Sequence, residues 1–578
     1  MRVSELQKER KAYQPKMPDV LKGKLHIVKG NPTESVADQE RVKELFPYTY
    51  GMPSITFEKG EDADAKHDPI NVGVLLSGGQ APGGHNVIAG IFDGIKALNP
   101  ESKLYGFLMG PSGLIEHKYM ELTDEIIDEY RNTGGFDMIG SGRTKLETKD
   151  QFDSGLRILH ELPISALVII GGDDSNTNAC VLAEYYKSID AGVQVIGCPK
   201  TIDGDLKNEQ IETSFGFDTA TKVYSEIIGN IERDCNSARK YWHFIKVMGR
   251  SASHIALECA LQTQPNICLI SEEVEEKKQS LSQIVEYIAS IVAKRAADGN
   301  NFGVALIPEG LIEFIPSMRD LISELNDLLA KVGDDFAHTP KEEQLEFIAS
   351  RLSAENAVAF RSLPDTVAYQ IAGERDPHGN VQVSLIETEK LLSGMVAKKL
   401  AEWKKEGKYE GSFKTQHHFL GYEGRCAAPS NFDADYCYTL GFTASKLIEA
   451  GLTGYMSSVQ NLTREVSQWI AGGTPITMMF NIERRGGKDK PVIRKALVDL
   501  EGAPFREFES HREEWAKETA FVYPGPIQYW GPSSVCDRPT KTILLEHKKG
   551  LSTLYRLRGG IGASDPAPFA IFVHEDFQ

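Results

Sequence analysis

The sequence lacks the segments that carry a protein into or across a membrane. Its first residues are charged and hold no apolar core like that of a secretory signal. No run of about 18 apolar residues occurs. Its eight cysteines are scattered, with neither a Cys-x-x-Cys motif nor a Cys/His cluster at zinc-binding spacing. We therefore expect a cytoplasmic protein with buried, reduced cysteines and no membrane partner.

Basic residues are outnumbered as well. The chain has 64 Lys and Arg against 82 Asp and Glu, a formal net charge of −18. A protein that binds nucleic-acid backbones needs a basic surface, so nucleic acid is excluded as a general partner. An anionic small substrate is still compatible with this charge. It must be held by a few well-placed cations and backbone amides.

With 578 residues, the chain is too long for one compact core, and we expect two or three domains. Strands that alternate with helices indicate parallel sheets. We predict an α/β fold with two Rossmann-like lobes, mostly parallel sheets around a shared cleft, and a helical insertion with apolar positions three and four apart. The predicted boundaries are an N-terminal extension (1–70), a first lobe (71–240), a second lobe (241–310 and 411–480), the insertion (311–410) and a C-terminal segment (481–578) that completes the lobes.

Two glycine-containing loops are candidate anion sites. SGGQAPGG (77–84) lies between a predicted strand and a predicted helix, where backbone N–H groups can approach a phosphate. It is neither Gly-x-Gly-x-x-Gly nor a Walker A loop, and a glycine turn selected for tight packing is the alternative. GSGRTK (140–145) offers Arg143 as a phosphate contact, with a solvated loop arginine as the alternative.

GGDDS (171–175) follows an apolar strand. A carboxylate at a glycine-rich strand end suits Mg²⁺, which proteins commonly hold with one or two carboxylates plus substrate phosphates. The alternative is a helix N-cap supplied by Asp174 or Ser175. We assign the metal to Asp173.

PKTIDGDL (199–206) is the sharpest local signal. Of its two carboxylates, one can accept the proton of an attacking hydroxyl while the other orients that group or faces the metal. Lys200 supplies a positive charge for a phosphoryl group in transit. The alternative is an ordinary turn rich in Asp and Gly.

Three weaker motifs follow. Arg250 in KVMGRSASH can hold a phosphate, and Glu309 in IPEG can accept hydrogen bonds from sugar hydroxyls. Tyr422 and Arg425 in GYEGR form a second candidate anion clamp. The alternative for Arg250 is a contact with a surface carboxylate.

Taken together and in order, these motifs resemble the phosphofructokinase family over residues 71–310 and 416–460. The length and the helical insertion resemble its long, pyrophosphate-dependent branch. The ATP-using branch has glycine at the positions of Asp174 and Lys200, and histidine at that of Tyr422. A carboxylate at the first position repels the α-phosphate and nucleoside of ATP, whereas pyrophosphate has neither. The added lysine stabilises the phosphoryl group, so the pair opposes one donor and favours the other.

The resemblance implies reversible, Mg²⁺-dependent phosphorylation of the 1-hydroxyl of fructose 6-phosphate by pyrophosphate, a step of glycolysis and gluconeogenesis. The first lobe then binds the donor and the second the sugar phosphate, and Asp203 is the base. Lys240 and Tyr241 match positions that reach a neighbouring subunit, which implies a homodimer. The implied catalytic residues are Asp203, Lys200, Asp174 and Asp205; the donor contacts are Gly78, Gly79, Arg143 and Lys200; the substrate contacts are Thr201, Ile202, Asp203, Lys240, Tyr241, Met248, Gly249, Arg250, Glu309, Tyr422, Glu423, Gly424 and Arg425; and the metal ligand is Asp173.

Four other functions compete with this one. An ATP-dependent enzyme is disfavoured by Asp174 and Lys200, and a non-catalytic regulatory subunit by the intact carboxylates of the TIDGD loop. A different sugar or lipid kinase that shares only the GGD loop leaves the MGR, PEG and GYEGR motifs unexplained. In a pure binding module, two placed carboxylates beside a lysine would lower stability without a function.

Overall fold

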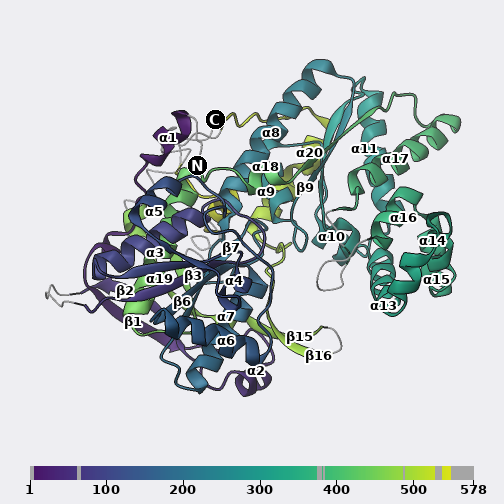
Figure 1. Ribbon diagram of the computed structural model, residues 1–578. Coiled ribbons are helices and arrows are strands. Elements are labelled where there is room, and N and C mark those ends of the chain that lie inside the picture. Colours follow the sequence, from purple (N-terminus) through teal and green to yellow (C-terminus); the bar gives the residue numbers. More distant parts are fainter. Residues whose placement is uncertain are drawn as a thin grey trace, which may run out of the picture.

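The computed structural model describes residues 5–60, 67–373, 381, 385–485, 488–526 and 537–547. The predicted fold class is confirmed: helices cover two mostly parallel sheets, which form two lobes (Figure 1). The larger sheet has ten strands in the order β1-β2-β14-β13-β7-β6-β3-β4-β5, with β8 paired to β7. The smaller sheet has the order β10-β11-β9-β12.

The centre of the larger sheet consists of β3 (Asn71–Leu76), β6 (Ala166–Gly171) and β7 (Gln194–Thr201), which pair in parallel. Their residues are almost continuously apolar because both faces of the sheet are covered. Side chains alternate between the faces: Val74 belongs to one core and its neighbour Leu75 to another.

Helices α3 (Gly84–Leu98) and α19 (Asn431–Glu449) lie on one face of this sheet, and α6 (Lys149–Glu161) and α7 (Asp173–Ser188) on the other. Helices α3 and α19 pack closely because glycines face the contact. A Cβ at Gly90 would lie 2.2 Å from the carbonyl oxygen of Tyr438, and one at Gly441 would lie 2.0 Å from that of Val87. Any larger residue would push the two helices apart.

The N-terminal extension adds strands to the larger sheet. β1 (Leu25–Pro32) pairs with β2 (Pro53–Lys59), and β2 pairs with β14 (Ile470–Pro475). β14 in turn pairs with β13 (Tyr455–Gln460), which lies beside β7. The far edge holds β4 (Lys103–Phe107) and β5 (Tyr119–Leu122), and β8 (Phe215–Gly216) is a short branch.

The smaller sheet is parallel throughout: β10 (Ile267–Cys268), β11 (Gly303–Pro308), β9 (Trp242–Val247) and β12 (Thr415–Leu420). α8 (Phe217–Ala238) and α9 (His254–Thr263) cover one face. α11 (Leu281–Ala297) and α17 (Thr388–Lys405) cover the other.

The boundaries between the two lobes differ from the predicted ones. Residues 431–480, which we expected in the second lobe, form α19, β13 and β14 of the larger sheet. α8, expected in the first lobe, packs on the smaller sheet. Buried Asp433 joins the two regions by accepting hydrogen bonds from the amides of Gly216 and Thr219. A strand–helix pattern is the same in either lobe, so it does not indicate which sheet a strand joins.

The stretch predicted as an insertion is largely helical. Four helices gather at one end of the molecule, away from the larger sheet (Figure 1). They are α13 (Pro316–His338), α14 (Lys341–Ala349), α15 (Ala354–Ser362) and α16 (Asp365–Ala372). The remaining elements named in Figure 1 are α1 (Glu5–Lys11), α2 (Gln39–Leu45), α4 (Pro111–Ile115), α5 (Asp124–Tyr130), α10 (Ser271–Glu276), α18 (Tyr422–Arg425), α20 (Ala503–Lys517) and the hairpin β15 (Phe480–Arg485) with β16 (Lys488–Ile493). Residues 548–578 of the predicted C-terminal segment lie outside the described residues.

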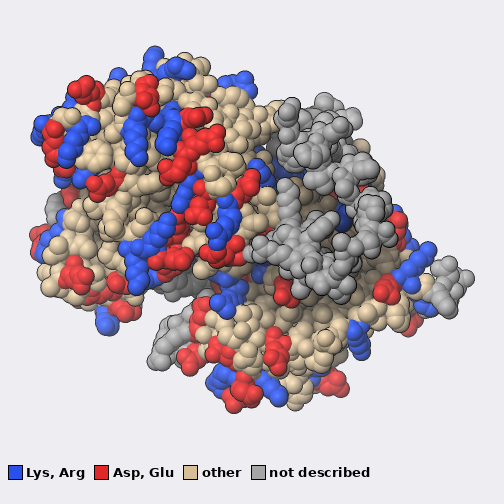
Figure 2. Space-filling model, turned by 180° about the vertical axis from the view of Figure 1, so that it is seen from behind, with Lys and Arg blue, Asp and Glu red and all other residues tan. Residues whose placement is uncertain are grey.

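Charges of both signs are interspersed on the face shown in Figure 2. Of the cysteines in the described residues, six are buried, but Cys426 is exposed, so the expectation of buried cysteines is wrong there. Cys426 directly follows the short helix α18, at the loop end of β12. Within the described residues, no helix has both the length and the apolar composition that crossing a membrane requires.

Candidate active site

The predicted motifs meet at the carboxyl ends of parallel strands. The loops after β3, β6 and β7 come from the larger sheet, and those after β9, β11 and β12 from the smaller one. Loops at this end of parallel strands are where α/β proteins bind ligands. The contacts described below join loops of the two lobes.

The glycine loop after β3 leaves room for cations. Gly78 has a φ of 89°, and its amide donates to the carbonyl of Gly142 (2.9 Å). A Cβ at Gly78 would lie 3.2 Å from Nζ of Lys200, and one at Gly79 would lie 2.5 Å from Nη1 of Arg425. Glycine is therefore needed here, both for the left-handed backbone at Gly78 and for the approach of Arg425 at Gly79.

Lys200 lies at the end of β7 and is 6% exposed. Burial, and then the nearby guanidinium of Arg425, lower the pKa of Lys200 to about 8. Arg143 lies close as well, since its Nη2 would be 3.6 Å from a Cβ at Gly79. Three cationic side chains thus surround the glycine loop, an arrangement that suits a small, highly charged anion.

The GGDDS motif begins a helix without a side-chain cap. The N-cap of α7 is Gly172, so the alternative that Asp174 or Ser175 caps it is wrong. Asp174 forms an ion pair with Lys145 (3.0 Å), and Ser175 donates a hydrogen bond to Oγ of Ser77 (2.8 Å). Asp174 and Ser175 therefore tie this turn to the GSGRTK loop and the glycine loop.

The TIDGD loop places two carboxylates beside each other. Oδ1 of Asp203 is 3.8 Å from Nη2 of Arg425, and the Asp203 amide donates to Oγ1 of Thr201 (3.1 Å). Asp205 is buried; burial, followed by the charge of Asp203, raises its pKa to about 7. Asp203 is the more accessible carboxylate, with 20% of its side chain exposed against 10% for Asp205. Asp203 is thus better placed to meet a substrate.

On the other side, Glu309 follows β11 and is 5% exposed. Burial, and then the charge of Asp203, raise its pKa to about 7. Its Oε2 atom is buried and has no hydrogen-bond partner within the described structure. Gly310 allows Arg250 to lie close, since a Cβ at Gly310 would be 1.9 Å from the Arg250 carbonyl oxygen. A buried, unpaired acceptor next to two arginine-containing loops suits a polyhydroxy ligand with a phosphate.

Arg425 connects the two sides. Its Nη1 donates to the carbonyl of Gln80 in the glycine loop, and its Nε contacts Sδ of Met248 (both 3.3 Å). Gly424 allows α18 to pack on α8, because a Cβ there would lie 2.7 Å from the ring of Tyr224. The tyrosine hydroxyl donates to the carbonyl of Gly421, and this bond fixes the loop that carries Arg425.

Five predicted residues are not drawn into this cluster in the single chain. The side chain of Tyr422 is 70% exposed, and Lys240 is exposed. Tyr241 packs edge-on against His243 (ring centroids 6.4 Å apart). Glu423 is exposed, and its carboxylate accepts a hydrogen bond from the Gly421 amide (2.7 Å). Ile202 is buried in the core behind the TIDGD loop.

Sequence reasoning missed Lys495. Its Nζ lies 3.7 Å from Oδ2 of Asp173 and 3.9 Å from Oδ2 of Asp205, and it donates to Oγ of Ser251 (2.6 Å). The surrounding letters, KPVIRKALVD, contain no glycine, histidine or strand-end motif that would mark a site. Only the fold brings this lysine to the carboxylates.

The residues present fit a divalent cation bound together with a phosphate ligand. Among the described residues, no group of three or more His, Cys, Asp and Glu side chains is arranged to hold a metal alone. Asp173 has 30% of its side chain exposed, in the first turn of α7. Mg²⁺ commonly takes one or two carboxylates and completes its shell with phosphates and waters, so Asp173 suffices as a protein ligand.

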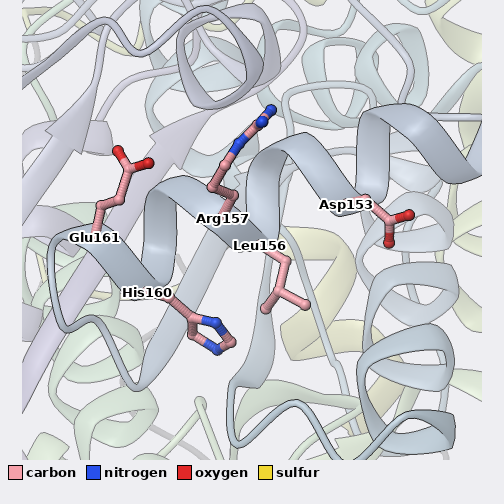
Figure 3. A pocket seen from close by; sticks show the side chains of 5 residues that line it. All are labelled: Asp153, Leu156, Arg157, His160 and Glu161. Carbon is pink, nitrogen blue, oxygen red and sulfur yellow. The ribbon is translucent and has the colours of Figure 1, made fainter.

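A surface hollow of about 500 Å³ lies elsewhere, on α6. Its lining side chains all come from that one helix and point in different directions (Figure 3). Arg157 and His160, for example, lie on opposite sides of the ribbon. Around Arg425, by contrast, charged side chains from loops of both lobes point toward one another.

The family model described as Phosphofructokinase matches residues 71–448. The chain belongs to the phosphofructokinase family. It is 64% identical to pyrophosphate–fructose 6-phosphate 1-phosphotransferase of Porphyromonas gingivalis, over 94% of this chain and 99% of that protein. It is 55% identical to the protein of that name from Treponema pallidum, over 94% and 97% respectively. The predicted family is confirmed.

Two plant relatives and one solved structure are also similar to this chain. The Arabidopsis thaliana beta 1 subunit of pyrophosphate–fructose 6-phosphate 1-phosphotransferase is 51% identical to this chain, and the alpha 2 subunit 37%. The crystal structure of a pyrophosphate-dependent phosphofructokinase from Marinobacter aquaeolei superposes with a TM-score of 0.50 at 15% identity, covering 78% of this chain and 93% of that one. At this identity the superposition shows the fold alone.

Proposed function

We propose that this protein transfers a phosphoryl group from pyrophosphate to the 1-hydroxyl of fructose 6-phosphate, giving fructose 1,6-bisphosphate and phosphate. The observation that carries the proposal is the donor pocket, in which buried Lys200 adjoins the glycine loop and Asp174 stands in the first turn of α7. The names of relatives 64% and 55% identical along nearly their whole length support the same reaction.

On the donor side, the amides of Gly78 and Gly79 and the side chains of Arg143 and Lys200 would hold pyrophosphate. The three cations converge on this loop, and the charge of buried Lys200 acts in a medium of lower dielectric than water, whereas Arg143 is exposed. Asp173 would hold Mg²⁺, which when bound neutralises phosphate charge and orients the donor. Asp174, which is paired with Lys145, would exclude ATP because its carboxylate would repel the α-phosphate of a nucleotide.

On the acceptor side, the sugar would lie between the TIDGD loop and the loops of the smaller sheet. The unpaired Oε2 of Glu309 would accept a hydrogen bond from a sugar hydroxyl, with Met248, Gly249 and Arg250 beside it. Thr201 and Arg425, with Gly424, would complete the pocket, while Ile202 packs behind it and Glu423 holds the turn at Gly421. Tyr422, Lys240 and Tyr241 are left for contacts that a second subunit completes.

In the chemical step Asp203 would accept the proton of the 1-hydroxyl. The sugar oxygen then forms a bond to phosphorus, the bridging P–O bond of pyrophosphate breaks, and phosphate leaves with the bond electrons. Arg425, 3.8 Å from Asp203, and Lys200 would stabilise the negative charge that spreads over the phosphoryl oxygens. Asp205 would support the loop, because it is more deeply buried than Asp203.

Three finer features belong to the same proposal. The exposed Lys240 and Tyr422 fit a homodimer in which each subunit completes the other's sugar site. Pyrophosphate stores less free energy than ATP, so we expect the reaction to run in both directions, in glycolysis and in gluconeogenesis. A cytoplasmic location agrees with these substrates.

A non-catalytic regulatory role is the second candidate, because the Arabidopsis thaliana relatives of this chain are named as beta and alpha subunits of pyrophosphate–fructose 6-phosphate 1-phosphotransferase. This chain retains both carboxylates of the TIDGD loop and the buried lysine beside them. The arrangement favours a catalytic chain.

The test is a coupled assay of the purified protein with fructose 6-phosphate and Mg²⁺, with pyrophosphate or ATP as the donor. Turnover with pyrophosphate and none with ATP is the expected result. Turnover with ATP alone would overturn the account of Asp174 and Lys200. No turnover with either donor would favour the regulatory role.

A further inference from the structure

A short segment after the β15–β16 hairpin lies across the junction of the two lobes. The Arg494 amide donates to the carbonyl of Met479 and the Ala496 amide to that of Asp205 (both 2.8 Å). His254 of the smaller-sheet lobe donates from Nε2 to the carbonyl of Ala496 (2.7 Å). Backbone bonds on both sides therefore hold Lys495 in place between the lobes.

The Lys495 side chain enters the site between Asp173 and Asp205. Its Nζ lies 3.7 Å and 3.9 Å from their respective Oδ2 atoms. The hydroxyl of Ser251, next to Arg250, accepts a hydrogen bond from the same nitrogen. The ammonium thus has one short polar contact and two longer ionic ones, and it stands where a cation between these carboxylates would stand.

We propose that Lys495 is a built-in counterion that competes with the divalent cation for the Asp173/Asp205 carboxylate pair. The inference rests on the proposed function in one respect, the assignment of the metal to Asp173. An ammonium and a divalent cation within about 4 Å of one carboxylate repel each other strongly. The donor-free protein should therefore bind the cation weakly, although its two carboxylates lie close to each other.

A competing lysine has a functional advantage. Without Lys495, the carboxylates of Asp173 and Asp205 would attract a divalent cation before any donor was present. No donor phosphate would then fix the position in which that cation binds. With this lysine, the free energy of cation binding depends on donor phosphates that interact with both Lys495 and the metal. Lys495 is thus a positioning residue that couples cation binding to donor binding.

The test measures cation binding without turnover. Mn²⁺ alone is titrated into the donor-free protein at low ionic strength, and free Mn²⁺ is followed by electron paramagnetic resonance. We expect Lys495→Met to bind Mn²⁺ at least about tenfold more tightly than the wild type, because a unit charge about 4 Å away is removed. Lys490→Met is the matched control: this lysine lies in β16, just before the segment that carries Lys495, but it pairs with Glu147 at the surface, and its loss should leave the affinity unchanged.

Two further variants locate the effect. Lys495→Arg keeps the charge and should retain the weak affinity of the wild type, even if Lys495→Met is poorly folded. The double variant Lys495→Met/Asp173→Asn should lose the gained affinity. Equal Mn²⁺ affinity of wild type and Lys495→Met, with circular dichroism showing both folded, would overturn the proposal. So would a gain in affinity that persists in the double variant.

This readout is independent of the assay for the proposed function. A wild-type protein that is inactive with pyrophosphate, together with tighter Mn²⁺ binding by Lys495→Met, would refute the reaction and leave the counterion standing. An active wild type with unchanged Mn²⁺ binding by the variant would do the reverse.

Discussion

Replacing Lys200 by methionine should make the protein more stable and nearly inactive. Lys200 is 6% exposed, and its ammonium lies over the ring of Phe136 (6.0 Å to the centroid). Methionine has a similar length and an apolar end that suits this environment. The substitution therefore removes a buried charge without leaving a large cavity.

The size of the effect follows from the pKa of Lys200, which is lowered from the usual 10.5 to about 8. Each pH unit of difference corresponds to about 1.4 kcal/mol, so burial of the charged form disfavours folding by about 3 kcal/mol. Because the folded-state pKa is the lower one, this penalty is fully present below about pH 8. It disappears as the pH rises from about 8 toward 10.5.

The assay compares apparent melting temperatures of the wild type and Lys200→Met at pH 7 and pH 10. We expect the variant to melt several degrees higher at pH 7, with a smaller difference at pH 10. Pyrophosphate-driven turnover should fall by about a thousandfold or more, because a charge on the transferring phosphoryl group is lost. Lys187→Met, an exposed lysine in the last turn of α7, should change neither quantity appreciably.

Two results would refute this reasoning. A variant that melts below the wild type at pH 7 would show that Lys200 makes stabilising contacts that outweigh its burial. A variant that keeps turnover within about tenfold of the wild type would show that the ammonium does not act on the transferred group.

Three more predictions concern the site. Asp203→Asn should abolish turnover, by a factor of about a thousand or more, while calorimetric binding of fructose 6-phosphate is nearly unchanged; an active variant would exclude Asp203 as the base. The double change Asp174→Gly with Lys200→Gly should give measurable turnover with ATP, and no gain at all would sink the account of donor specificity. Since the pKa of Glu309 is raised to about 7, kcat/KM for fructose 6-phosphate should fall as the pH drops below about 7 and this carboxylate is protonated. Glu309→Gln should lose that part of the pH profile, and a profile unchanged in the variant would contradict the role of Glu309.

Much of the site could be predicted because its residues stand next to strand ends. SGGQAPGG, GGDDS and PKTIDGDL each follow an apolar run that became β3, β6 or β7. Parallel strands bring their carboxyl ends to one edge, so these loops had to meet. The family resemblance puts Lys200 and the glycine loop into one set of donor contacts, and in the structure the two lie next to each other.

The rest depended on long-range packing that leaves no local mark. Nothing near Lys495 distinguishes it from other surface lysines, and only the bonds of the Arg494 and Ala496 backbones bring it inside. The assignment of β13 to the larger sheet follows from the α3–α19 contact, which depends on glycines within ordinary helices. Cys426 is exposed at the end of the short helix α18, and no local pattern distinguishes it from the buried cysteines.

The strand order also has a consequence during synthesis on the ribosome. β2 ends at Lys59, but β14, the strand with which it pairs in the larger sheet, begins at Ile470. At about 5–20 residues per second, the edge of β2 must wait about 20–80 seconds for its partner. During that time it is an unpaired, aggregation-prone edge. We therefore expect a nascent chain stalled before β14 to depend on chaperones far more than the finished protein does.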